Sequence, residues 1–97
     1  MKLVGIGDLL IPAPYIEAGF SGYREKGVQI EVVDWPLKDY EELQGINLQV
    51  ETQGSEVYDV PDALIDKLRD AEILITQFCP ITKKVLDACT KLRFIGV

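Results

Sequence analysis

The sequence predicts an α/β protein with a parallel sheet, and three observations carry that prediction. Short apolar runs at residues 2–6, 28–33, 73–75 and 94–97 are typical of four buried strands. Segments with helical periodicity separate these runs, which favours parallel strands joined by right-handed crossovers and covered by helices on both faces. The run at 28–33 alternates apolar and polar residues, so it is expected at a sheet edge. The order 2-1-3-4 of a flavodoxin-like three-layer fold puts it there.

The first helix is marked by proline at its start and glycine at its end. Pro12 and Pro14 suit the first helical positions, and Gly27 suits the stop. One face of this helix is formed by four residues at helical spacing, namely Ile16, Gly19, Phe20 and Tyr23.

Residues 37–54 carry signals for both a helix and a strand. A helix would have an apolar face made of Tyr40, Leu43, Ile46 and Val50. Ile46, Leu48 and Val50 also alternate as a strand would, and Gly45 weakens both patterns. The acidic start at Asp39, Glu41 and Glu42 suits a helix N-terminus, so a helix is favoured.

Two shorter helices complete the crossovers. Pro61 is expected as the first residue of one, with Leu64, Ile65 and Leu68 buried. Thr82 is expected to cap the other, whose buried residues are predicted to be Val85, Leu86 and Cys89.

Composition limits the classes of function. The chain has 97 residues, 47% of them hydrophobic and 27% charged, which suits one globular domain. No apolar run approaches the ~20 residues that span a bilayer, so a cytoplasmic location and no membrane partner are expected. The net charge of −6, with scattered basic residues, argues against nucleic acid as a partner.

Several catalytic and cofactor motifs are absent from the sequence. The chain has no His, which excludes Ser-His and Cys-His nucleophile pairs. Its two cysteines, Cys79 and Cys89, make no metal cluster and are expected to be reduced. Gly5 and Gly7 begin a dinucleotide fingerprint, but Asp8 follows and the third glycine is missing. There is no P-loop, and Thr76-Gln77 stands where a phospho-receiver domain needs an Asp.

Residues 71–97 resemble part of a known enzyme family. An apolar strand leads into a polar loop, a helix and a second apolar run. The matching segments are Pro80-Ile81-Thr82, Lys84-Val85-Leu86-Asp87-Ala88 and Lys91-Leu92-Arg93-Phe94-Ile95-Gly96-Val97. This pattern of about 25 residues resembles the substrate domain of the NAD-dependent D-2-hydroxyacid dehydrogenases, the group that includes phosphoglycerate dehydrogenase.

The resemblance implies an oxidoreductase built from two domains. In that family, a nucleotide-binding domain follows the substrate domain, binds NAD or NADP and carries the catalytic Arg, Glu and His. Hydride then passes between the cofactor and C2 of a small 2-hydroxy or 2-keto acid. Those catalytic residues are therefore expected after Val97, and the 97-residue chain alone is expected to bind no cofactor and to be inactive. A homodimer is implied for the full-length protein.

One loop carries the implied substrate contacts. The resemblance places Gln77, Phe78 and Cys79 at the cleft, partly through backbone N–H groups. Phosphoglycerate dehydrogenases often have Arg-Ser at the positions of Thr76-Gln77, so the lack of Arg here argues against a phosphorylated substrate. Phe78 would form an apolar wall.

Each of these residues also has a plainer interpretation. Phe78 could be a core aromatic, Gln77 could serve only the loop backbone, and Cys79 could be only a compact turn residue. Asp8 is expected to be a turn residue, whereas Trp35 and Tyr40 are expected in a core or an interface.

Two other functions stay open at this point. The chain could be a stand-alone flavodoxin-like binding module without catalysis, which would be stable on its own. It could also be a flavin-binding domain, in which case the purified protein would be yellow.

Overall fold

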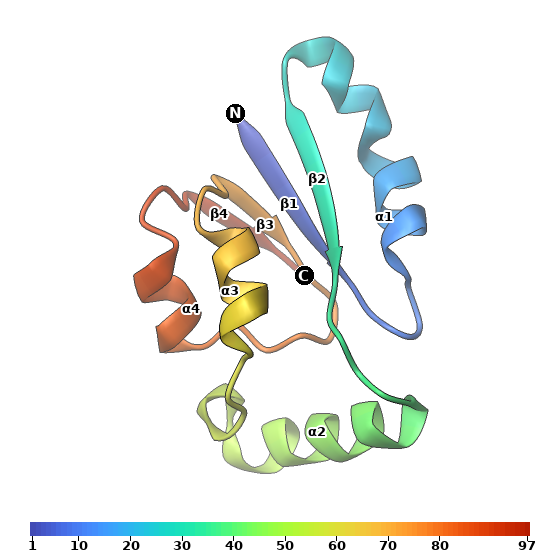
Figure 1. Cartoon of the computed structure of the whole chain (residues 1–97), viewed down its shortest axis with the longest axis vertical. Coiled ribbons are helices and arrows are strands. Elements are labelled where there is room, and N and C mark those ends of the chain that lie inside the picture. Colours follow the sequence, from blue (N-terminus) through green and yellow to red (C-terminus); the bar gives the residue numbers. More distant parts are fainter.

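The computed structural model describes all residues from 1 to 97 and contains one all-parallel sheet. The strands are β1 (Lys2–Gly7), β2 (Gln29–Asp34), β3 (Ile73–Ile75) and β4 (Phe94–Gly96). Their order is β2-β1-β3-β4, so the predicted order 2-1-3-4 and the edge position of β2 are confirmed (Figure 1). This α/β arrangement is that of a flavodoxin-like fold.

Helical segments connect the strands. The α-helices are α1 (Ala13–Phe20), α2 (Tyr40–Gln53), α3 (Asp62–Leu68) and α4 (Lys83–Ala88). Two 3₁₀ segments, η1 (Ser21–Lys26) and η2 (Ser55–Val57), follow α1 and α2. No helix of the chain is both long enough and apolar enough to cross a membrane.

The residues predicted to start and end helical segments do so in the structure. Within residues 37–54 the predicted helix is found as Tyr40–Gln53, and Asp39 caps it by accepting a hydrogen bond from the Glu42 N–H at 2.9 Å. Thr82 caps α4 in the same way through the Val85 N–H. Gly27 ends the first helical segment at φ 84°, a left-handed conformation that glycine adopts without steric cost.

One face of the sheet is fully packed. Val4, Ile6 and Leu74 point to the side that α3 and α4 cover, and they belong to a single core cluster with the buried residues of both helices. Trp35 completes this core, and its indole N–H donates a hydrogen bond of 2.9 Å to the Tyr58 hydroxyl. The cluster holds the carboxyl ends of β1 and β3 in place, so the loops that follow these strands have fixed starting points.

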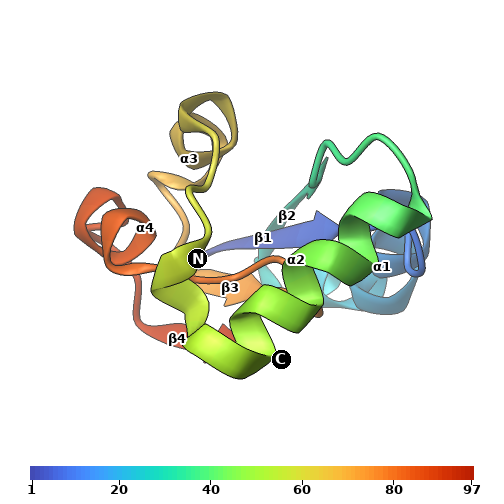
Figure 2. The same ribbon diagram turned by 90° about the horizontal axis from the view of Figure 1, so that it is seen from below.

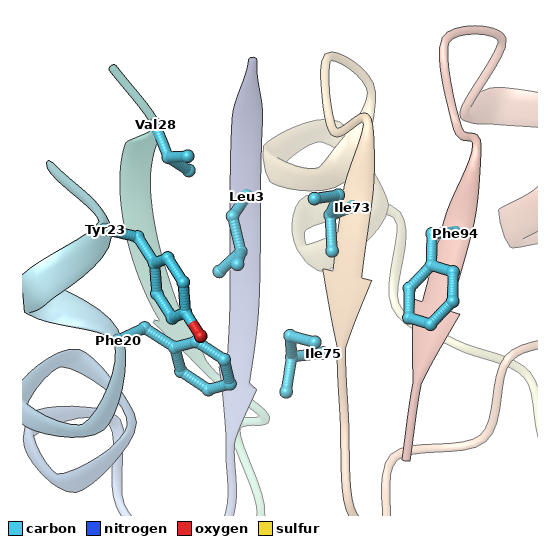
Figure 3. A pocket seen from close by; sticks show the side chains of 7 residues that line it. All are labelled: Leu3, Phe20, Tyr23, Val28, Ile73, Ile75 and Phe94. Atoms are coloured by element: carbon cyan, nitrogen blue, oxygen red, sulfur yellow. The ribbon is translucent and has the colours of Figure 1, made fainter. Parts of the chain in front are cut away.

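Helices lie on both faces of the sheet, as expected, but the opposite face is only half covered. Helix α1 packs over β1 and β2 through Ile16, and β3 and β4 have no helix on that side. An apolar hollow of about 220 Å³ lies there (Figure 3). Its lining residues are Leu3, Phe20, Tyr23, Val28, Ile73, Ile75 and Phe94. The side chain of Phe94 is consequently 61% exposed.

One predicted core position, Leu86, is wrong, and Tyr40, which was expected in a core or an interface, is not part of the core. Leu86 is 46% exposed because α4 has only six residues and contacts the core along one line, through Val85 and Cys89. Tyr40 is also exposed, and Leu43 is the only fully buried residue of α2. The reason is that α2 does not cover a face of the sheet. It crosses the carboxyl ends of the strands, as Figures 1 and 2 show.

Candidate functional site

The carboxyl edge of the sheet carries two loops, one after β1 and one after β3. In parallel sheets, ligands bind outside this edge, so both loops are candidates for a site. They differ in whether their backbone N–H groups already donate hydrogen bonds within the chain.

Acidic side chains close the loop after β1. The Asp8 Oδ1 atom accepts hydrogen bonds of 2.8 Å from the N–H groups of both Leu10 and Ile11. Asp34 Oδ1 accepts a hydrogen bond of 3.1 Å from the N–H of Ala13, the first residue of α1. Asp8 is therefore a turn residue, as expected, and an anionic ligand would find these donors occupied by carboxylates.

Asp8 is also a buried negative charge. Its side chain is 5% exposed, and its Oδ2 atom has no hydrogen-bond partner within the chain. A buried carboxylate oxygen without a donor repels other anions nearby more strongly than a solvated one does.

The loop after β3 is tied at both ends and open in the middle. The Thr76 N–H donates to the Gly96 carbonyl at 3.0 Å, and the Thr76 hydroxyl donates to the Cys79 carbonyl at 3.1 Å. Between these anchors, the backbone N–H groups of Gln77, Phe78 and Cys79 donate no hydrogen bond to any atom of the chain. Three consecutive backbone donors without a partner in the chain, at the edge of a parallel sheet, are candidate contacts for an acceptor on a ligand.

The three predicted site residues occupy different depths in this loop. Gln77 is exposed and its amide makes no hydrogen bond within the chain. Phe78 is half-buried and packs against the core cluster. Cys79 is 4% exposed, and burial together with the negative charge of Asp8 raises the pKa of its thiol to about 12. The Cys79 side chain is therefore a neutral thiol near pH 7 and not a nucleophile.

All three residues line one cavity of about 280 Å³. The complete lining consists of Val50, Ser55, Thr76, Gln77, Phe78, Cys79, Pro80, Ile81, Ile95 and Val97. The wall of this cavity was expected to consist of the loop alone. It also includes the end of α2, the start of η2 and strand β4. The only sequence signal for this wall is the helical stripe that contains Val50, and it does not indicate a cavity.

A second cavity lies on the other side of the same loop. It has a volume of about 470 Å³ and is bounded by α1 and β3. Thr76, Gln77 and Val97 line both cavities, so they form the partition between them. No Lys or Arg lines either cavity.

The cavity wall has few ionisable side chains. No group of three His, Cys, Asp or Glu side chains could hold a metal ion. The only ionisable residue in the wall of the 280 Å³ cavity is Cys79, and the pKa of Cys89, which lies in the core, is also raised by burial. The arrangement can donate backbone hydrogen bonds, and no lining side chain is a carboxylate, an imidazole or an amine.

No protein-family model, curated protein or solved structure matches the chain.

Proposed function

We propose that this chain is the substrate-domain portion of an NAD-dependent D-2-hydroxyacid dehydrogenase. One observation carries the proposal. The loop at residues 76–81 offers three free backbone N–H groups at the carboxyl edge of β3, within the segment that resembles that family. These donors suit the carboxylate or the C2 oxygen of a 2-hydroxy or 2-keto acid.

The chain supplies one side of a shared site in this proposal. The free N–H groups orient the acid, and the half-buried Phe78 keeps water from one side of it. NAD or NADP, when bound by a nucleotide-binding domain, provides or accepts the hydride at C2. No Lys or Arg lines the cavities, so the positive charge that pairs with the substrate carboxylate comes from that other domain.

The residues of this chain do not fit a cofactor site of their own. A pyrophosphate bound after β1 would need free backbone donors, and the carboxylates of Asp8 and Asp34 occupy those of Leu10, Ile11 and Ala13. We therefore expect the 97-residue protein to oxidise no NADH in the presence of pyruvate or glyoxylate. NADH oxidation by the purified chain would contradict this division of work.

A pair of variants at Gln77 tests the role of the loop. Proline at this position removes one N–H group, whereas alanine keeps it, and the Gln77 side chain makes no hydrogen bond within the chain that either change would remove. A charge-assisted hydrogen bond contributes ~1.5–3 kcal/mol, so we expect Gln77→Pro to weaken pyruvate binding by roughly tenfold or more.

Gln77→Ala is the matched control and should leave the affinity unchanged. Binding is measured by NMR-detected titration of the purified chain, with circular dichroism to confirm that both variants are folded. Equal affinities for the two variants, or no binding of any 2-keto acid by the unaltered protein, would contradict the proposal and would favour a binding module of another kind.

A further inference from the structure

We propose that the 280 Å³ cavity receives the part of the acid that begins at C3 and selects neutral, apolar groups over charged ones. Val50 at the end of α2 is then a residue that determines specificity. This inference rests on the proposed function, because it assumes that the acid end of the ligand lies on the loop at residues 76–81.

The side chains in the wall of the cavity carry no formal charge near neutral pH, and the α-carboxylate of Val97 in the 97-residue protein adds a negative one. Six of its ten lining residues are hydrophobic. The polar ones are Ser55, Thr76 and Gln77, and the Thr76 hydroxyl is already used by the Cys79 carbonyl. Cys79 has the single ionisable side chain, and its thiol stays protonated because burial raises its pKa to about 12. A charged substituent would find no counter-ion here.

Charges outside the wall make the cavity still less suitable for an anion. The Lys84 ammonium is held by Asp62 at 2.7 Å and by Asp59 at 3.2 Å, and that of Lys83 is held by Asp87 at 2.7 Å. The charge that acts on Cys79 is the buried carboxylate of Asp8, which is negative. A second carboxylate or a phosphate in the cavity would thus be desolvated beside a like charge.

The size of the cavity favours a substituent larger than a methyl group. A volume of about 280 Å³ is far more than a single methyl group fills. The methyl group of pyruvate would leave most of the apolar wall without contacts, whereas a branched chain of several carbons would cover it.

Val50 is firmly placed for such a role. It lies in the last turn of α2, where its carbonyl accepts a hydrogen bond of 2.8 Å from the Gly54 N–H. Leu48 lies on the same helix, but it is 62% exposed and does not line the cavity. The two positions therefore form a matched pair for substitution.

The test compares three acids that share the 2-keto carboxylate and differ at C3. Pyruvate has a methyl group, 4-methyl-2-oxopentanoate has a branched apolar chain, and 2-oxoglutarate has a second carboxylate. Titrations of the 97-residue protein, followed by the loop amides and the Val50 methyl groups, should give an affinity for the branched acid at least ~10-fold above that for 2-oxoglutarate. The Val50 methyl resonances should shift with the branched acid.

A lysine at either α2 position sharpens the result. Val50→Lys should bring 2-oxoglutarate to an affinity equal to or above that of the branched acid, whereas Leu48→Lys should leave the order unchanged. Should Val50→Lys fail to fold by circular dichroism, Val50→Thr keeps the shape and should weaken binding of the branched acid alone.

The outcomes separate this inference from the proposed function. If pyruvate shifts the loop amides but all three acids bind equally, or 2-oxoglutarate binds best, the specificity proposal is overturned and the proposed function stands. If no acid shifts the loop amides, the proposed function fails and the inference fails with it.

Discussion

The loops after β1 and β3 lie side by side at the same edge of the sheet, yet they treat their backbone donors in opposite ways. After β1, Asp8 and Asp34 accept hydrogen bonds from the N–H groups that a ligand would need. After β3, Thr76 holds the two ends of the loop and leaves three N–H groups free. Topology thus offers two equivalent places for a ligand, and the side chains decide which of them is open.

The largest expected effect on stability concerns the loop after β1. A Cβ atom on Gly7 would lie 2.4 Å from the Ala13 nitrogen and 2.8 Å from Asp34 Oδ1. Backbone must move to make room, so Gly7→Ala should lower the free energy of unfolding by about 3 kcal/mol. Gly19→Ala is the control, because nothing lies within 4 Å of its added Cβ and helix propensity favours alanine. Urea unfolding measures both. Equal stabilities for the two variants would show that the loop is not closed as described.

The next largest expected effect is a loss of stability at alkaline pH, caused by ionisation of Cys79 in the loop after β3. Burial, and to a lesser extent Asp8, raises the pKa of Cys79 to about 12 in the folded protein, whereas the unfolded thiol titrates near 9. The folded state therefore holds this proton more tightly, and its contribution to stability is complete below pH 9 and is lost as the pH rises towards 12.

The urea midpoint of the unaltered protein should consequently fall between pH 9 and 12, and less so for Cys79→Ala. The raised pKa values of Cys89 and Tyr58 act in the same direction in both proteins. Burial is the largest cause of the Tyr58 shift and Cys79 a lesser one, so the difference between the two proteins reports mainly on Cys79. An identical pH dependence for both proteins would refute the burial of this thiol.

A smaller effect is expected when the carboxylate at the start of α1 is removed. Asp34→Ala leaves the Ala13 N–H without its acceptor and should cost ~1 kcal/mol, as losses of helix caps do. Asp34→Asn keeps an oxygen acceptor and should cost much less. Thermal unfolding of the two variants checks this, and equal losses would mean that charge rather than the hydrogen bond matters.

The smallest effect on stability is expected for Asp8→Asn. The amide keeps the Oδ1 acceptor for Leu10 and Ile11, and the atom it replaces has no partner. Removing the negative charge should lower the pKa of Cys79 while leaving it above 9, because burial is the larger cause. Thiolate absorbance during alkaline titration of a Cys89→Ser background measures this. An unchanged titration would show that Asp8 does not act on the open loop.

Much of this architecture could be predicted because its signals are local. Apolar runs located the strands, alternation in residues 28–33 gave the edge position of β2, and Asp39, Thr82 and Gly27 marked helix ends. Such signals depend on residues a few positions apart.

The errors arose where distant segments meet. Leu86 and Tyr40 have helical spacing that suits a core, but α4 is too short and α2 crosses the edge of the sheet instead of covering a face. The contribution of Val50 to the cavity depends on that crossing, so no local pattern indicates it. The half-open face of the sheet was missed for the same reason.

The most direct test of the account follows the amide resonances of both loops while pyruvate is added to the ¹⁵N-labelled protein. We expect saturable shifts at Gln77, Phe78 and Cys79, with Leu10, Ile11 and Ala13 unmoved. Shifts confined to the loop after β1, or no shift in either loop at saturating acid, would contradict it.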